Sequence, residues 1–262
     1  MGRASGIDPK GISYLNDLIK EIRPDKLPNQ MKILDFGCGP GSLVNGLREI
    51  GYNAYGCDVD ENNNLKIKYG DSLYKDNILR PIDKNHYQIP FEDDSFDLVL
   101  SISVFEHVFN KEESFKEIKR VLKKDGLSIH TLPSKYYLPV EPHLRVPLLN
   151  YFLPNCPDWY YAFFAILGIR SPSHKQTNIK DWRIVAKENM NYSKNYLSYI
   201  NLRSYEKLSM KIFGNFSWGD EIFIRNNKNS KIARICRKLP FKKYTGWFIR
   251  QFRSGVLICK KV

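Results

Sequence analysis

A glycine-rich turn is the part of this sequence whose residue types and spacing most directly suggest chemistry. Gly37, Gly39 and Gly41 alternate directly after the short apolar and acidic run 33–36, and a helical pattern begins at Ser42. Glycine permits positive φ angles and lets a ligand approach the main chain where a Cβ would obstruct it. We therefore expect the turn to bind a nucleotide-like ligand.

Two acidic residues narrow the class of that ligand. Asp35 stands two places before Gly37, where the dinucleotide-binding fingerprint usually has an apolar residue, and Ser42 stands at that fingerprint's third glycine. An acid suits a cationic or hydroxylated ligand better than a pyrophosphate. Asp58 follows Gly37 by 21 residues, near the interval of about 20 residues at which a carboxylate binds ribose hydroxyls. The alternative is that Asp58 is an ordinary loop acid.

The elements that must position these residues follow at the distances of a doubly wound α/β sheet. Helical spacing predicts helices over 42–50 and around 115–122, and apolar runs predict strands over 53–57, 96–101, 127–132, 217–224 and 255–260. Residues 1–30 are interpreted as an N-terminal helical segment and residues 31–134 as the cofactor-binding core. The whole chain, 1–262, is expected to form a single domain.

Three stretches together resemble a known family. They are the glycine turn, the run 89–100 with its proline-phenylalanine and phenylalanine-aspartate pairs, and the run 104–108 with Glu106 and His107. They resemble the class I S-adenosylmethionine-dependent methyltransferases, in the small-molecule, type 11-like branch, over about residues 30–134. The resemblance implies S-adenosylmethionine as the cofactor and a seven-stranded, mostly parallel Rossmann-like sheet with an antiparallel edge.

The resemblance also implies where the cofactor would bind. The methionine portion would contact Asp35, the main chain of the three glycines and Ser101, and the ribose would contact Asp58. Val59 would lie against the adenine, and Asn85 or His86 would approach its edge. Asn85 and His86 depart from the residues that the family often has there. The implied cofactor-binding residues are Asp35, Gly37, Gly39, Gly41, Asp58, Val59, Asn85, His86 and Ser101.

Methyl transfer from a sulfonium requires orientation of the acceptor and exclusion of water. A hydroxyl acceptor must also lose a proton, for which histidine is suited near neutral pH. The candidate catalytic residues are His107 and His143, with Glu141 as a partner or second base. The alternative for His107 is a side chain that shapes the cofactor pocket. His130 lies in an expected strand and is interpreted as structural.

Residues 135–213 are interpreted as a substrate-side insertion or lid. Five prolines between 139 and 157 prevent one continuous helix, and an aromatic cluster follows at 159–164. The cluster could form a pocket wall for a hydrophobic or sugar acceptor, or a packing layer over the sheet.

The last part of the chain, 214–262, is strongly basic. Residues 170–262 contain 21 basic and 5 acidic side chains, whereas residues 1–169 contain 20 and 23, and no acid follows Glu221. Ile232, Ile235, Cys236 and Leu239 have helical spacing with cations mostly off that stripe. Such a segment predicts contact with an anionic membrane surface, and the alternatives are a solvated helix face or a nucleic-acid partner, for which no RNA-binding signature is present.

Composition sets further expectations. The chain has an odd number of cysteines and no C-x-x-C pair, which disfavours a disulfide framework or a zinc site. We therefore expect no metal and a reducing compartment. The expected location is the cytoplasm, with possible association with a membrane. The leading function is methyl transfer to a small, sugar or lipid-linked acceptor, as in polysaccharide, quinone or lipid biosynthesis. The alternatives are an RNA or protein methyltransferase and a catalytically inactive binding protein. The sequence indicates neither the acceptor atom nor the oligomeric state.

Overall fold

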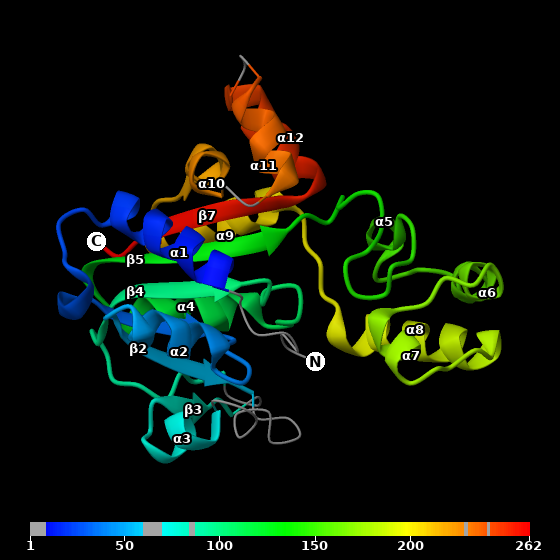
Figure 1. Ribbon diagram of the computed structural model, residues 1–262, viewed down its shortest axis with the longest axis horizontal. Helices are drawn as coiled ribbons and strands as arrows, with labels where there is room; N and C mark the ends of the chain where they lie inside the picture. Colours follow the sequence, from blue (N-terminus) through cyan, green and yellow to red (C-terminus); the bar gives the residue numbers. More distant parts are fainter. Residues whose placement is uncertain (1–8, 60–69, 84–86, 228–229, 240–241) are drawn as a thin grey trace.

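A seven-stranded sheet forms the centre of the molecule (Figure 1). The structure is a computed structural model that describes residues 9–59, 70–83, 87–227, 230–239 and 242–262. The strand order is β3-β2-β1-β4-β5-β7-β6, with β7 antiparallel to both of its neighbours and the other pairs parallel. The strands are β1 (Lys32–Phe36), β2 (Asn53–Asp58), β3 (Leu79–Pro81), β4 (Phe96–Ile102), β5 (Leu122–Pro133), β6 (Ser217–Trp218) and β7 (Ser254–Lys260). The predicted fold class is confirmed.

Helices cover both faces of this sheet (Figure 1). One face packs against α1 (Pro9–Ile22), α2 (Ser42–Glu49) and α10 (Asp220–Asn226), and the other against α4 (Lys111–Val121) and α9 (Leu202–Phe213). Leu47 on the first face and Phe115 on the second are fully buried. The single turn η1 (Pro28–Gln30) precedes β1, and α3 (Gly70–Lys75) lies beside β3. The apolar side chains whose spacing predicted helices over 42–50 and around 115–122 are the side chains that pack against the sheet.

A lobe with its own apolar core follows β5. It contains α5 (Leu149–Phe152), α6 (Asp158–Ile166), α7 (Pro172–Gln176) and α8 (Trp182–Tyr196), and it lies beyond the carboxyl ends of β4 and β5 (Figure 1). Tyr161 is fully buried in this core, whereas Trp159 and Phe163 are exposed. Part of the aromatic cluster therefore packs inside the lobe and part is exposed, so the alternative of a packing layer over the sheet is wrong, and the alternative of a pocket wall stays a prediction.

The chain between 217 and 226 differs from its prediction. Only Ser217–Trp218 form a strand, and Asp220–Asn226 form α10, so the expected strand 217–224 is wrong for most of its length. Two acids in the first turn suit the positive end of a helix dipole. Phe223 contacts the ring of Tyr14 on α1, and Ile224 packs toward α11 and α12, so tertiary packing favours the helical spacing.

Two basic helices, α11 (Lys231–Arg237) and α12 (Lys242–Phe252), pack on α10 beside the last strands (Figure 1). Their shared core is small and consists of Ile224, Cys236 and Ile249. All five cysteines of the chain are buried, and none of them forms a disulfide. Among the described residues, no helix combines the length and the apolar character needed to cross a bilayer.

Candidate functional site

The glycine turn follows β1 and takes a conformation that its sequence predicts. Gly37, Gly39 and Gly41 all have positive φ, at 79°, 52° and 77°. The amides of Gly37 and Cys38 both donate to the carbonyl of Cys57, at 2.8 and 3.1 Å, and so fasten the turn to the end of β2. Gly41 then caps the N-terminus of α2. The turn thus places main-chain groups at the carboxyl ends of two adjacent strands.

The three glycines meet different surroundings. A Cβ on Gly37 would lie 2.4 Å from a methyl of Val104, and one on Gly41 would lie 2.7 Å from a methyl of Leu79. Among the described residues, a Cβ on Gly39 would meet only the carboxylate of Asp58, at 4.0 Å. Gly37 and Gly41 are therefore required by packing as well as by φ, whereas the side of Gly39 is open for a ligand.

Asp58 lies on this open side, and Asp35 precedes the glycine turn in β1. Asp58 ends β2, is half-buried, and accepts a hydrogen bond from the Gly39 amide at 2.6 Å through Oδ2. Asp35 is fully buried in β1, paired with Gly56 of β2 and Leu100 of β4. The structure brings both predicted acids to the glycine turn. An adenosyl sulfonium fits this donor set, because a carboxylate can accept from ribose hydroxyls and a negative charge suits a cation.

The other predicted cofactor residues have varied surroundings. The hydroxyl of Ser101, near the end of β4, lies 2.8 Å from Nδ1 of His130, and both side chains are fully buried. Burial lowers the pKa of His130 to about 3, so this histidine is a neutral structural group. Val59 is half-buried against the apolar core. Asn85 and His86 lie outside the described residues.

The three candidate catalytic residues come together at the junction of the sheet and the lobe. Nε2 of His107 lies 3.2 Å from Nε2 of His143, and Nδ1 of His143 lies 2.7 Å from Oε1 of Glu141. His107 belongs to the loop after β4 and His143 to the loop after β5. Residues 36 positions apart in the sequence are therefore in direct contact.

Hydrogen bonds hold Glu141 in place although it is fully buried. Its Oε2 accepts from the amides of His143 and Leu144 at 2.8 and 2.6 Å, and its Oε1 accepts from the hydroxyl of Tyr199 at 2.9 Å. Burial raises the pKa of Glu141, but the hydrogen bonds from His143, Leu144 and Tyr199 outweigh burial and leave it below its ordinary value. Glu141 is thus a carboxylate that orients His143.

The two histidines differ in their electrostatics. Burial, and next the charge of His143, lower the pKa of His107 to about 4. Burial also acts to lower the pKa of His143, but the hydrogen bond and charge of Glu141 outweigh it and raise that pKa above its ordinary value. Positive charge is therefore favoured on His143 rather than on His107.

Some residues of this cluster were not identified from the sequence. The carbonyl of Tyr196, at the end of α8, lies 2.7 Å from Nδ1 of His107. The carbonyl of Glu106 accepts from the amide of Ser198 at 2.6 Å, and Nζ of Lys111 donates to the carbonyl of Ser198 at 2.6 Å. A hydrogen bond to a main-chain carbonyl does not depend on the side chain, so the sequence could not identify these partners. The spacing of Tyr192, Tyr196 and Tyr199 toward the end of a helix was the available signal that this segment contributes to the site.

The histidine cluster is connected to the glycine turn through one loop. Val104, whose methyls lie against Gly37, accepts a hydrogen bond through its carbonyl from the amide of His107 at 2.8 Å. The same turn of chain therefore packs on the candidate cofactor site and presents His107. The arrangement can place a group held by the histidines close to a cofactor held by the glycine turn.

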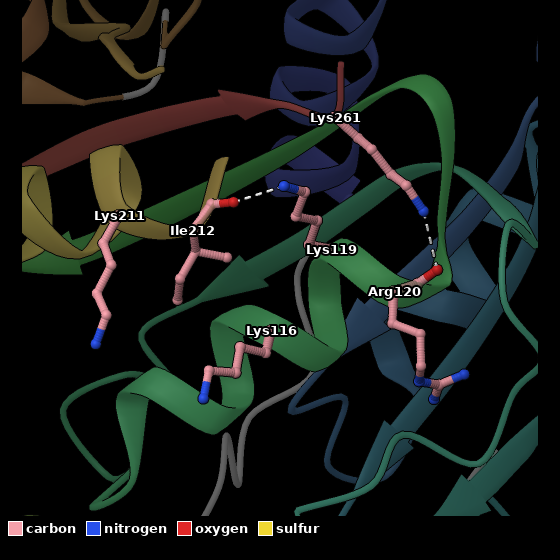
Figure 2. Close-up of a pocket in the computed structure, with 6 residues that line it drawn as sticks. All are labelled: Lys116, Lys119, Arg120, Lys211, Ile212 and Lys261. Atoms are coloured by element: carbon pink, nitrogen blue, oxygen red, sulfur yellow. Dashed lines mark hydrogen bonds between the residues drawn. The ribbon is translucent and has the colours of Figure 1, made fainter. Parts of the chain in front are cut away.

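A separate basic hollow lies on the face of the sheet covered by α4 and α9. It has a volume of about 420 Å³ and is lined by Lys116, Lys119, Arg120, Lys211, Ile212 and Lys261 (Figure 2). Nζ of Lys119 donates to the carbonyl of Ile212 and Nζ of Lys261 to the carbonyl of Arg120 (Figure 2). Arg120 also pairs with Glu117 and Asp93. These cations stabilise the packing of the elements and are not part of the candidate site.

Comparison with known proteins agrees with this geometry. Residues 34–130 match the family model described as "Methyltransferase domain". The uncharacterized protein MJ0638 of Methanocaldococcus jannaschii is 35% identical over 103 residues, which are 39% of this chain and 41% of that protein. The ubiquinone biosynthesis O-methyltransferase of Bradyrhizobium diazoefficiens is 28% identical over 130 residues, which are 47% of this chain and 50% of that protein. The chain spans at most about half the length of these relatives.

A solved structure has the same fold over nearly the whole chain. The YcgJ protein of Bacillus subtilis superposes with a TM-score of 0.50 and 14% identity, and the match covers 94% of this chain and 98% of that one. The sheet order, the glycine turn with Asp58 and the family match all point to the same assignment. Residues 34–130 of the chain therefore match a methyltransferase domain.

Proposed function

We propose that this chain transfers the methyl group of S-adenosylmethionine to a small, sugar or lipid-linked acceptor. The observation that carries the proposal is the open side of Gly39, which faces the carboxylate of Asp58 inside a methyltransferase domain. A glycine turn closed by side chains would exclude a cofactor, but a Cβ on Gly39 would have no neighbour nearer than 4.0 Å within the described ranges of the chain.

Different residues of the chain would bind different parts of the cofactor. When bound, S-adenosylmethionine supplies an activated methyl group, whose bond to sulfur breaks with the electron pair remaining on sulfur. Asp58 would accept hydrogen bonds from the ribose, and Asp35 with the main chain of the turn would hold the methionine portion. Fixing the acceptor against the cofactor and excluding water can contribute several kcal/mol, on the order of 7 or more, to lowering the barrier.

The acceptor would bind between the sheet and the lobe. His107 and His143 lie at that junction, and their catalytic role, with Glu141 as the partner of His143, stays a prediction. The lobe supplies tyrosines to this junction, since the ring of Tyr192 lies 6.1 Å from that of His143 and Tyr199 bonds to Glu141. Aromatic rings with polar tips suit a sugar or an aromatic alcohol, and one relative is named as a ubiquinone biosynthesis O-methyltransferase.

Titration calorimetry with S-adenosylmethionine tests the proposal. Asp58→Ala should weaken binding at least tenfold, because it removes the acceptor of the ribose hydroxyls and a hydrogen bond to a charged group contributes about 1.5–3 kcal/mol. The control is Asp76→Ala, which removes an exposed acid just after α3. Absence of binding to the wild-type protein, or equal affinities of the two variants, would contradict the proposal.

A further inference from the structure

We propose that Glu106, His107 and His143 bind one divalent first-row transition-metal ion. One ligand atom from each of these residues lies within 4.8 Å of the other two. The sequence itself gave no metal signal, because the residues come from two loops and have no short ligand spacing. The site becomes visible only where the loops after β4 and β5 meet.

The distance between the two histidines fits a shared cation. Their Nε2 atoms are 3.2 Å apart. Metal–nitrogen bonds of about 2.0–2.1 Å place two nitrogens on one tetrahedral or octahedral ion roughly 3 Å apart. The two rings are T-shaped with an interplanar angle of 78°, and Nε2 is the atom of each ring that lies against the other ring's Nε2.

The far nitrogens of both rings have the partners that metal-binding histidines usually have. Nδ1 of His107 lies 2.7 Å from the carbonyl of Tyr196, so Nδ1 must carry a proton and donate it. Nδ1 of His143 lies 2.7 Å from the carboxylate of Glu141 and donates likewise. With Nδ1 as the donor in each ring, Nε2 is the nitrogen that can bind a metal ion, and the proton that charges His143 would leave when the ion binds. Such carboxylate and carbonyl partners orient the ring and strengthen its binding of a metal.

The third ligand and the surroundings complete the site. Glu106 is 2% exposed, and its main chain is fixed by the amide of Ser198. Two imidazoles and one carboxylate favour ions of the manganese-to-zinc series over magnesium, which prefers oxygen ligands and retains its water. Three protein ligands leave positions open for an acceptor.

A cation here would define the acceptor as an alcohol or a vicinal diol. Coordination lowers the pKa of a bound hydroxyl, so its proton can leave to solvent and its oxygen can form the new bond to the methyl carbon. This role rests on the methyl-transfer function proposed above, whereas binding of the cation does not.

Titration of chelator-treated full-length protein with Co²⁺, followed by visible absorption, tests the site. We expect one ion per chain, and at least a tenfold loss of affinity in each of Glu106→Gln, His107→Gln and His143→Gln. Glu141→Gln, which alters the carboxylate that orients His143 without removing a ligand atom, should lower affinity by about 10–100-fold. His174→Gln is the matched control, because His174 is buried against Ser171 and Glu188 in the lobe, and it should bind Co²⁺ as the wild-type protein does.

A second measurement on the unaltered chain keeps the test independent of variants that fail to fold. Crystals soaked in Mn²⁺ should give an anomalous peak between the two Nε2 atoms. The proposal would be overturned by the lack of an anomalous peak, by the lack of Co²⁺ absorption, or by an equal loss of binding in His174→Gln. The contact between the two histidines would then be a hydrogen bond in which they share a proton. Calorimetry with S-adenosylmethionine reports separately on the methyltransferase function, so failure of one proposal is distinguishable from failure of the other.

Discussion

The assignment of the cofactor site depends mainly on Gly39 and Asp58, which are hydrogen-bonded to each other and leave the side of Gly39 accessible to a ligand. The Gly39 amide donates to Asp58, and in the part of the chain that the structure describes, a Cβ on Gly39 would meet only that carboxylate. Gly37, two positions earlier, is instead packed against Val104. The same residue type therefore serves ligand access at one position and close packing at the other, and the spacing of glycines alone does not distinguish the two.

Asp97 is the buried acid that anchors the start of β4. It is 1% exposed, and it accepts from the amide of Lys32 at 2.8 Å and pairs with Lys26 and Lys123. Burial raises the pKa of Asp97, but the hydrogen bonds from Lys26, Lys32 and Lys123 outweigh burial and hold that pKa below its ordinary value. The charged form of Asp97 is therefore the form that stabilises the fold.

Asp97→Asn should lower the free energy of unfolding by about 2 kcal/mol at neutral pH. Because the pKa of Asp97 is lower in the folded state, its contribution is complete above the unfolded value of about 4 and is lost as the pH falls below it. Urea unfolding at several pH values should show the wild-type and variant curves converging in acid.

Asp93→Asn is the matched control for this prediction. Asp93 pairs with Arg120 at an exposed position, where an ion pair contributes little. The charge of Asp97 does not stabilise the fold if Asp97→Asn changes the free energy of unfolding by an amount that is independent of pH. The same conclusion holds if that change is no larger than the change for Asp93→Asn.

The basic C-terminal part of the chain, 214–262, uses several of its cations inside the molecule. Arg250 pairs with Asp220, Arg225 with Glu21, and the lysines that end the chain pair with acids near β4 and β5. Arg234 and Lys238 are exposed, as are Ile235, Tyr244, Trp247 and Phe248. We therefore place the proposed membrane contact on these six side chains rather than on the whole basic segment.

Sedimentation with phosphatidylserine-containing vesicles at two salt concentrations tests that contact. The wild-type chain should bind and lose affinity at high salt, because exposed cations are screened. Replacing Trp247 and Phe248 by alanine should weaken binding about tenfold or more, since burial of one aromatic side chain contributes about 1.5–3 kcal/mol.

Trp159→Ala with Phe163→Ala on α6 provides the control, because these two side chains are also exposed and aromatic but lie in the lobe. This control should bind vesicles as the wild-type chain does. RNA binding is measured beside vesicle binding. If the chain binds RNA but not vesicles, or if the two double variants lose equal vesicle affinity, the exposed aromatic side chains of α12 have another role.

At the level of the whole molecule, the candidate acceptor site forms where two separately packed parts meet. The sheet supplies His107, the chain entering the lobe supplies Glu141 and His143, and the chain leaving it supplies Tyr196 and Tyr199. The lobe has an apolar core of its own, distinct from the two cores that flank the sheet. The geometry of the histidine cluster therefore depends on how the lobe packs against the sheet.

The sequence predicted the sheet because its signals are local. Apolar runs and the glycine turn marked β1, β2, β4, β5 and β7, and the 21-residue interval to Asp58 located the second acid. The strand 217–224 was wrong because packing of Phe223 and Ile224 on other elements overrides local pattern. The contact of His107 with His143 was not predicted, since it depends on two loops and on the main chain of Tyr196.

The most direct test of the central claim is a crystal structure of this chain soaked with S-adenosylmethionine. We expect density for the adenosyl group against the open side of Gly39, with the ribose hydroxyls bonded to the carboxylate of Asp58 and the sulfonium near Asp35. An empty cleft at saturating cofactor, or a ribose bound away from Asp58, would contradict the account.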